Sequence, residues 1–152
     1  MPTLKLVGLL ILCAPLIGSC DSPGMDREEA SKRLVQLVDD ALTAGFKGQA
    51  VPDPDPVDFD PCTGRLGPTS QSRPTYKYVF PLTELGENSA DFADDATAVW
   101  ERHGMEVTVQ DDETLLERFA LSDDGFRFSL AVNRQANQVY IGGSGPCVDA
   151  AD

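Results

Sequence analysis

The side chains that could do chemistry in this chain are few, and their spacing does not match a known catalytic pattern. His103 is the only histidine. It stands before a glycine at the end of a predicted helix, where it can interact with the helix dipole. Ser144 lies in a glycine-rich loop, but the nucleophile-elbow pattern requires glycine where Pro146 stands. We therefore predict no catalytic residue and no cofactor, with a hydrolase that uses acids near this loop as an alternative.

A second group of candidates is acidic and lies in a proline-rich stretch. Asp53, Asp55, Asp58 and Asp60 supply the oxygen ligands that calcium prefers. They do not fit the EF-hand loop, because its sixth position holds aspartate in place of glycine and its last position holds glycine in place of glutamate. We expect a solvated acidic loop and predict no metal site, with calcium binding left open.

Four residues form a candidate binding face. Alternation along the predicted strands places Lys77, Arg118, Arg127 and Tyr140 together on the open side of a sheet, among small side chains. Arginine and aromatic side chains are common in recognition sites, so this face suits an anionic envelope polymer or a protein partner. The alternative is a solvated face whose cations pair with neighbouring acids.

Residues 1–19 have the organisation of an export signal. A weakly positive start with Lys5 is followed by an apolar run over residues 6–17 and then by two small residues. The run is shorter than the roughly 20 apolar residues that a membrane-spanning helix needs. The sequence Ile17-Gly18-Ser19-Cys20 resembles the lipobox of bacterial lipoproteins. The resemblance implies cleavage before Cys20, acylation of its sulfur, and a tether over residues 20–25 that holds the chain to membrane lipid.

The chain has four cysteines, and the export signal determines what each of them can do. Cys13 leaves with the signal and Cys20 is acylated, so Cys62 and Cys147 remain. Because thiols are oxidised outside the cytoplasm, we predict a disulfide between these two residues.

The charge balance excludes one class of partner. The chain carries a formal net charge of −13, whereas nucleic-acid binding requires clustered lysine and arginine to displace counterions. An anionic membrane surface would also repel the protein, so the acyl group and not a basic patch must hold it. We expect no nucleic-acid partner and an extracytoplasmic location at the cell membrane.

The remaining sequence predicts a single α+β domain over residues 26–152. A first helix begins at Asp26, which forms a capping box with Glu29, and ends at Gly45. A loop rich in proline and aspartate then covers residues 47–74, because this stretch shows no sustained apolar period.

A second helix and several strands follow this loop. Asn88 caps the helix, its buried face includes Trp100 and His103, and Gly104 ends it. Apolar residues alternate in five strands, over residues 76–80, 105–109, 115–121, 126–132 and 139–141. One face of such a sheet is apolar, so we predict a two-layer sandwich with a mostly antiparallel sheet of about five strands and two helices on one face.

Three loops set the expected strand registers. The Asp124-Gly125 pair predicts a two-residue hairpin in which Leu121 faces Phe128. A four-residue loop over residues 134–137 predicts the next hairpin, and a three-residue loop over residues 111–113 predicts a hairpin in which Val109 faces Leu115. The first register places Glu117 on the apolar face, where a carboxylate does not fit.

Three features of the second half of the chain carry a further resemblance. They are a tryptophan-containing helix that ends in glycine, the Asp-Gly hairpin with Phe126, and the Gly-Ser-Gly-Pro-Cys sequence at residues 143–147. In these features residues 76–148 resemble small cell-envelope lipoproteins of actinobacteria. Those proteins often have Gly-Ser-Ser-Pro-Cys where this chain has Gly-Ser-Gly-Pro-Cys. The resemblance implies an envelope lipoprotein without an assigned activity.

The leading hypothesis is therefore a non-catalytic accessory or binding module that is anchored to the membrane. A protease-inhibitor-like module is an alternative, because a helix packed on an antiparallel sheet resembles the cystatin architecture. The expected partners are membrane lipid through Cys20 and an envelope protein or anionic polymer.

Overall fold

The computed structural model describes residues 24–149. The predicted signal peptide over residues 1–19, the predicted acylation site Cys20 and most of the predicted tether lie outside the described residues. Within residues 24–149, none of the helices combines the length and the apolarity that a membrane crossing requires. The elements, in chain order, are α1 (Arg27–Phe46), β1 (Asp58–Gly64), β2 (Gly67–Pro81), the 3₁₀-helix η1 (Leu82–Ala90), α2 (Phe92–Arg102), β3 (Glu106–Asp111), β4 (Leu115–Leu121), β5 (Arg127–Asn133), β6 (Gln138–Ser144) and β7 (Val148–Asp149).

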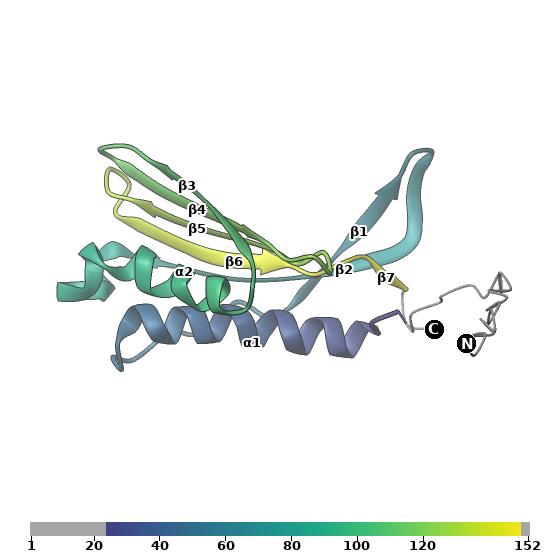
Figure 1. The fold of residues 1–152 in the computed structure, drawn as a ribbon, viewed down its shortest axis with the longest axis horizontal. Helices are drawn as coiled ribbons and strands as arrows, with labels where there is room; N and C mark the ends of the chain where they lie inside the picture. The colour runs from purple at the N-terminus through teal and green to yellow at the C-terminus, as the bar shows by residue number, and fades with distance from the viewer. Residues whose placement is uncertain (1–23, 150–152) are drawn as a thin grey trace, which may run out of the picture.

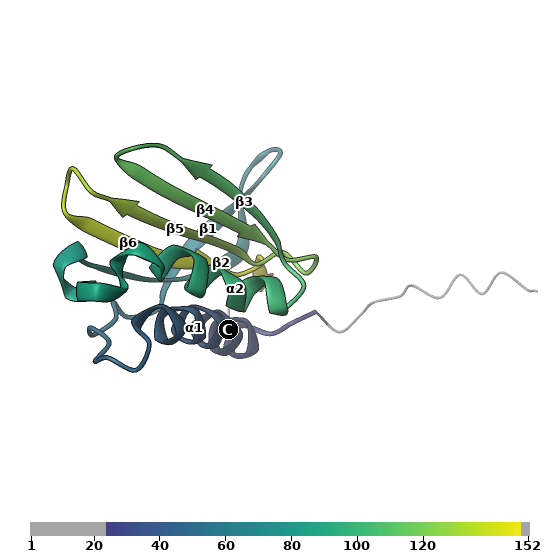
Figure 2. The ribbon, with the colours of Figure 1, turned by 60° about the vertical axis from the view of Figure 1, so that its left-hand side comes forward.

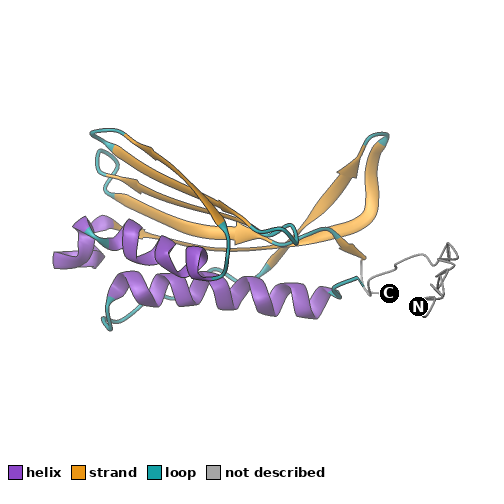
Figure 3. Cartoon of the chain, viewed as in Figure 1, coloured by secondary structure: helices purple, strands orange, loops and turns teal. Residues whose placement is uncertain are grey.

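These elements form two layers, a curved antiparallel sheet and a layer of helices that covers one of its faces (Figure 1, Figure 3). The sheet order is β1-β2-β6-β5-β4-β3, and β7 pairs with β2 beyond the end of β6. The predicted α+β class with antiparallel strands is confirmed. The sheet of the described chain has seven strands, which is more than the predicted five, and η1 is a third helix.

The region over residues 47–74 is not a loop throughout, because it contains β1 and the first half of β2. Its prolines hid the strand pattern in the sequence. β1 is an edge strand that pairs only with β2, and an edge strand tolerates proline because one of its sides needs no N–H donors. The segment before β1 stays outside the ladder, although the Asp55 N–H donates to the Lys77 carbonyl at 3.3 Å.

Helix α1 begins as predicted and ends differently. Asp26 is its N-cap, and the carboxylate accepts the Glu29 N–H at 2.7 Å. The helix continues past Gly45, because this glycine serves packing: a Cβ there would lie 2.4 Å from the Phe92 ring. Lys47, with a φ of 51°, takes the left-handed position at the end of the helix.

The two ends of helix α2 give one confirmation and two corrections. Asn88 does not cap this helix, since its side-chain amide donates to the Phe46 carbonyl at the end of α1, at 3.1 Å. α2 begins instead at Phe92, directly after η1. Gly104 follows the helix with a φ of 79°, which confirms the predicted stop. His103 is exposed rather than buried, because it lies at the C-cap, beyond the helical face that packs on the sheet.

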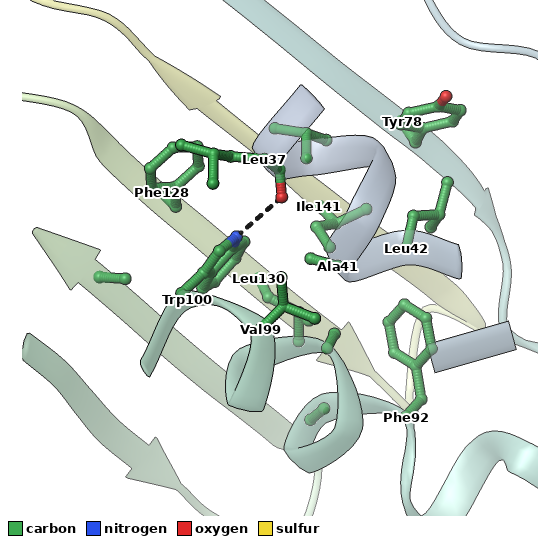
Figure 4. Close-up of a cluster of buried hydrophobic side chains, with 14 of the residues drawn as sticks. Leu37, Ala41, Leu42, Tyr78, Phe92, Val99, Trp100, Phe128, Leu130 and Ile141 are labelled. Atoms are coloured by element: carbon green, nitrogen blue, oxygen red, sulfur yellow. Dashed lines mark hydrogen bonds between the residues drawn. The ribbon is translucent and has the colours of Figure 1, made fainter. Parts of the chain in front are cut away.

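The core lies between the helices and the covered face of the sheet (Figure 4). Trp100 of α2 is fully buried, and its indole N–H donates to the Leu37 carbonyl of α1 at 3.1 Å. The indole ring also stacks on the Phe128 ring of β5, with ring centroids 5.2 Å apart. One side chain therefore joins both helices and the sheet.

The β4–β5 connection inverts the predicted faces of β4. The loop is not a two-residue turn, because the Ser122 N–H donates to the Phe126 carbonyl and leaves three residues between them. Gly125, with a φ of 91°, takes the left-handed third position that this type of loop requires. The register moves by one residue, and since side chains alternate, every side chain of β4 changes face.

Three side chains of β4 that were expected on the other face, and a misplaced glutamate, show the effect of this shift. Phe119 and Leu121, predicted to face the core, are 40% and 53% exposed on the open face. Arg118, predicted on the open face, is only 6% exposed. Glu117 lies on the open side, which removes the misfit. The predicted hairpin loop over residues 134–137 is confirmed. The register predicted from residues 111–113 is wrong, because Val109 pairs with Arg118 instead of Leu115.

The predicted disulfide is present. Cys62 of β1 is bonded to Cys147, a separation of 85 residues. Strands β6 and β7 run along the same edge of β2, and between them the Gly145 N–H donates to the Pro74 carbonyl at 2.9 Å. The disulfide therefore joins the β1–β2 hairpin to the C-terminal end of the sheet.

Candidate functional site

The open face of the sheet is concave. Strands β3–β6 and the β1–β2 hairpin rise on either side of it in Figure 1, and Figure 2 shows both helices on the opposite side. The groove between the two rising parts has a volume of about 920 Å³. Its wall contributes Asp55, Asp58 and Asp60, and its floor contributes Lys77, Phe119, Arg127, Ser129, Tyr140 and Ser144.

Strand pairing aligns the floor residues in rows across the sheet. Neighbouring strands are about 4.8 Å apart, so side chains in one row on one face are close neighbours. The first row, from β2 through β6 and β5 to β4, consists of Lys77, Gly142, Ser129 and Phe119. The second row, from β2 through β6 to β5, consists of Thr75, Ser144 and Arg127.

The structure places three of the four predicted binding residues in the groove: Lys77, Arg127 and Tyr140. The fourth prediction was wrong, because Arg118 is on the covered face. Its guanidinium pairs with Asp111 of β3 and, at 3.0 Å, with Asp94 of α2. Burial alone would lower the pKa of Arg118, but hydrogen bonds and charge interactions with the two aspartates outweigh burial and raise the pKa.

Lys77 and Arg127 are exposed, and neither forms an ion pair with any carboxylate in residues 24–149. The alternative prediction, in which ion pairs neutralise the open face, does not describe these two cations. Their charges are directed to solvent in the groove and are available to a ligand.

A second feature of the floor is the space that the Tyr140 ring occupies. The ring extends along β6 over Gly142, because a Cβ added to Gly142 would lie 2.9 Å from the Tyr140 Oη and 2.8 Å from the Lys77 Cβ. Gly142 therefore leaves the space in which the ring lies along the sheet. Sequence reasoning did not find this role, although a glycine two residues after a tyrosine in a strand is the signal for it.

The wall of the groove is acidic. Asp58 and Asp60 alternate along β1 with Phe59, and the Arg27 guanidinium lies 3.6 Å from the centre of the Phe59 ring. This contact holds β1 against the start of α1 and leaves the aspartates on the groove side. In the described chain, no group of three or more His, Cys, Asp or Glu side chains is placed to hold a metal ion.

The remaining candidates for chemistry are not brought together. Ser144 lines the groove, whereas His103 lies at the C-terminal end of α2, away from the lining. The groove lining contains hydroxyl, carboxylate, cationic and aromatic groups but no imidazole or thiol. The arrangement can bind through charge, hydrogen bonds and ring stacking.

A separate polar cluster lies on the covered face. The hydroxyls of Tyr76 and Tyr78 donate to the Asp39 carboxylate of α1, at 3.0 Å and 2.7 Å, and lie 3.1 Å from each other. Burial, followed by the hydrogen bonds to Tyr76 and Asp39, raises the pKa of Tyr78, and burial also raises the pKa of Tyr76. The cluster satisfies polar groups inside the core and attaches β2 to α1.

Comparisons of the chain with protein-family models, with curated proteins and with solved structures returned no match. The function of the groove must therefore follow from its own residues. Three properties matter most: two unpaired cations, an aromatic ring that lies along the floor, and an acidic wall.

Proposed function

We propose that this protein is a membrane-anchored, extracytoplasmic lipoprotein that acts as a non-catalytic binding module of the cell envelope. The groove on the open sheet face is its binding site. The observation that carries the proposal is the pair of exposed, unpaired cations, Lys77 and Arg127, beside the half-buried ring of Tyr140 in a protein with a net charge of −13. Concave sites with a few convergent polar groups are the usual location of ligand binding.

The anchoring part of the proposal rests on the export signal and on the lipobox-like sequence before Cys20. Two acyl chains on one cysteine are enough for stable attachment, whereas a single chain binds a membrane only reversibly. The Cys62–Cys147 disulfide supports an extracytoplasmic location, because disulfides persist in oxidising compartments. The resemblance to actinobacterial envelope lipoproteins supports the same location.

Anchoring is tested by replacing the acylated residue. In the full chain, Cys20→Ala should move the protein from the membrane fraction to the soluble fraction, and intact-mass analysis of the unchanged chain should show the added lipid. A Cys20→Ala chain that remains in the membrane fraction, or an unchanged chain without lipid, would contradict this part of the proposal.

The binding role of the groove is tested by site-specific photocrosslinking in intact cells. A photoreactive amino acid replaces Ser129 on the groove floor, and a matched control replaces Gln36, which is exposed on α1 on the other side of the molecule. We expect a discrete adduct from position 129 that is absent from position 36. The same adducts from both positions, or none from position 129, would contradict the role of the groove.

A further inference from the structure

We infer that the ligand of this groove is a glycan that carries carboxylates at intervals, with one sugar ring stacked on Tyr140 and its acidic groups bound by Lys77 and Arg127. This inference rests on the proposed function and names the chemical class of its ligand. Three observations on the floor and the wall select this class.

The first observation is the position of the Tyr140 ring on the groove floor. The ring lies along β6 in the space left by Gly142, between Lys77 of β2 and Ser129 of β5. An aromatic face that lies along a sheet and carries partial negative charge suits the row of C–H bonds on one side of a pyranose ring. The small neighbours on the floor leave room for a ring of this size.

The second observation is that the floor has no free backbone edge. Strands β5 and β6 are paired on both sides, so an extended peptide cannot add to them as a further strand, which is the usual way in which a sheet binds a peptide. Recognition at the floor must use side chains. The hydroxyls of Thr75, Ser129 and Ser144 can donate to and accept from the hydroxyls of a sugar.

The third observation is the division of charge between floor and wall. Lys77 and Arg127 lie on the floor, two strands and one row apart, and a guanidinium binds a carboxylate through two parallel hydrogen bonds. The wall carries Asp55, Asp58 and Asp60, which repel a ligand that presents negative charge on the side facing the wall. The ligand that fits both surfaces has separated carboxylates on one side and hydroxyl or N–H donors on the other.

The test uses the full chain in detergent micelles and oligogalacturonate as the probe, with its neutral methyl ester as the uncharged control and polyglutamate as the acidic control without sugar rings. Binding is measured by titration calorimetry. We expect binding of oligogalacturonate, weaker binding of the ester, and little binding of polyglutamate. Lys77→Gln and Arg127→Gln should each weaken oligogalacturonate binding about tenfold or more, because each removes a charged hydrogen-bond donor.

Matched variants separate the ring from the fold. Tyr140→Phe keeps the ring and should bind almost as the unchanged chain does, whereas Tyr140→Leu should lose most of the affinity. Lys32→Gln removes one positive charge from an exposed site on α1 and should bind normally. Thermal unfolding of each variant checks that it is folded.

The outcomes distinguish the glycan from the groove itself. No binding of oligogalacturonate, or equal binding of polyglutamate, overturns the carboxylated glycan, and a discrete crosslink from position 129 would then still support a groove with another ligand. If Lys77→Gln, Arg127→Gln and Tyr140→Leu leave the affinity unchanged and position 129 gives no adduct, both the carboxylated-glycan ligand and the binding role of the groove are overturned.

Discussion

Arg118 and Arg127 belong to strands that pair with each other, yet they lie on opposite faces of the sheet and in opposite electrostatic situations. Arg118 is 6% exposed on the covered face and has two aspartate partners. Arg127 is exposed on the open face and has no ion-pair partner in the described chain. An arginine therefore stabilises the fold at position 118, whereas at position 127 its charge is available to a ligand.

The difference follows from the cost of removing charge from water. A buried cation without a partner destabilises the folded state strongly, so a guanidinium on the covered face requires neighbouring carboxylates. An exposed cation has no such requirement. An open face that nevertheless leaves two cations unpaired, in a strongly acidic protein, has charge that the fold does not use.

Among variants that compare the covered and open faces, the largest effect on the free energy of unfolding should come from two phenylalanines on neighbouring strands. Phe128 is 2% exposed on the covered face and stacks on Trp100, whereas Phe119 is 40% exposed on the open face. We expect Phe128→Ala to lower the free energy of unfolding by about 3–5 kcal/mol, because it leaves a cavity. Phe119→Ala should cost about 1 kcal/mol or less. Urea unfolding of both variants measures the difference, and similar losses would mean that the faces of β4 are assigned wrongly.

A smaller effect should come from the partners of Arg118. The double variant Asp94→Asn with Asp111→Asn leaves its guanidinium buried without a counter-charge, so we expect a loss of about 3 kcal/mol. Asp40→Asn with Asp123→Asn removes the same charge from exposed positions and is the matched control. Urea unfolding at low salt compares the pairs. Equal stability of the two double variants would break the contrast between the paired and the unpaired arginine.

The smallest effect concerns the tyrosines beneath the groove floor. Because the pKa of Tyr76 and Tyr78 is raised in the folded state, the folded protein holds these protons more tightly than the unfolded chain does. Their contribution to stability is complete below the ordinary pKa of 10.0 and is lost as the pH rises through the raised values.

This titration is measured in a Tyr140→Phe background, where the chain retains two tyrosines. Tyrosinate absorbance should appear only above pH 10.0, together with loss of the folded state. Tyr78→Phe in this background should leave one delayed transition. Two transitions at the ordinary tyrosine value, with the fold intact, would show that the covered face does not exclude water from these hydroxyls.

The sequence was a good guide where local signals act alone. The Asp26 cap, the Gly104 stop and the disulfide between Cys62 and Cys147 each depend on residue types and spacing, and each is present in the structure. It was a poor guide where one residue decides between two loops. Gly125 can close a two-residue or a three-residue hairpin, and the choice moved Arg118 from one face to the other.

The candidate site was predictable in part for the same reason. Lys77, Arg127 and Tyr140 lie on strands whose alternation is regular, so their shared face could be inferred from the sequence. The wall could not, because the prolines concealed β1 and because a concave face depends on how far the hairpin bends away from the sheet. Gly142 was missed since its role depends on the ring of a neighbour.

The covalent bond between Cys62 and Cys147 has a consequence for when the protein can act. It fastens the strand that supplies Asp58 and Asp60 to the far end of the polypeptide. In a reducing environment the β2 ladder and the Arg27–Phe59 contact would still restrain that strand, but the covalent restraint would be lost. If the protein is exported and binds a ligand as proposed, we expect ligand binding to begin only after oxidation of Cys62 and Cys147, because this bond completes the wall of the groove.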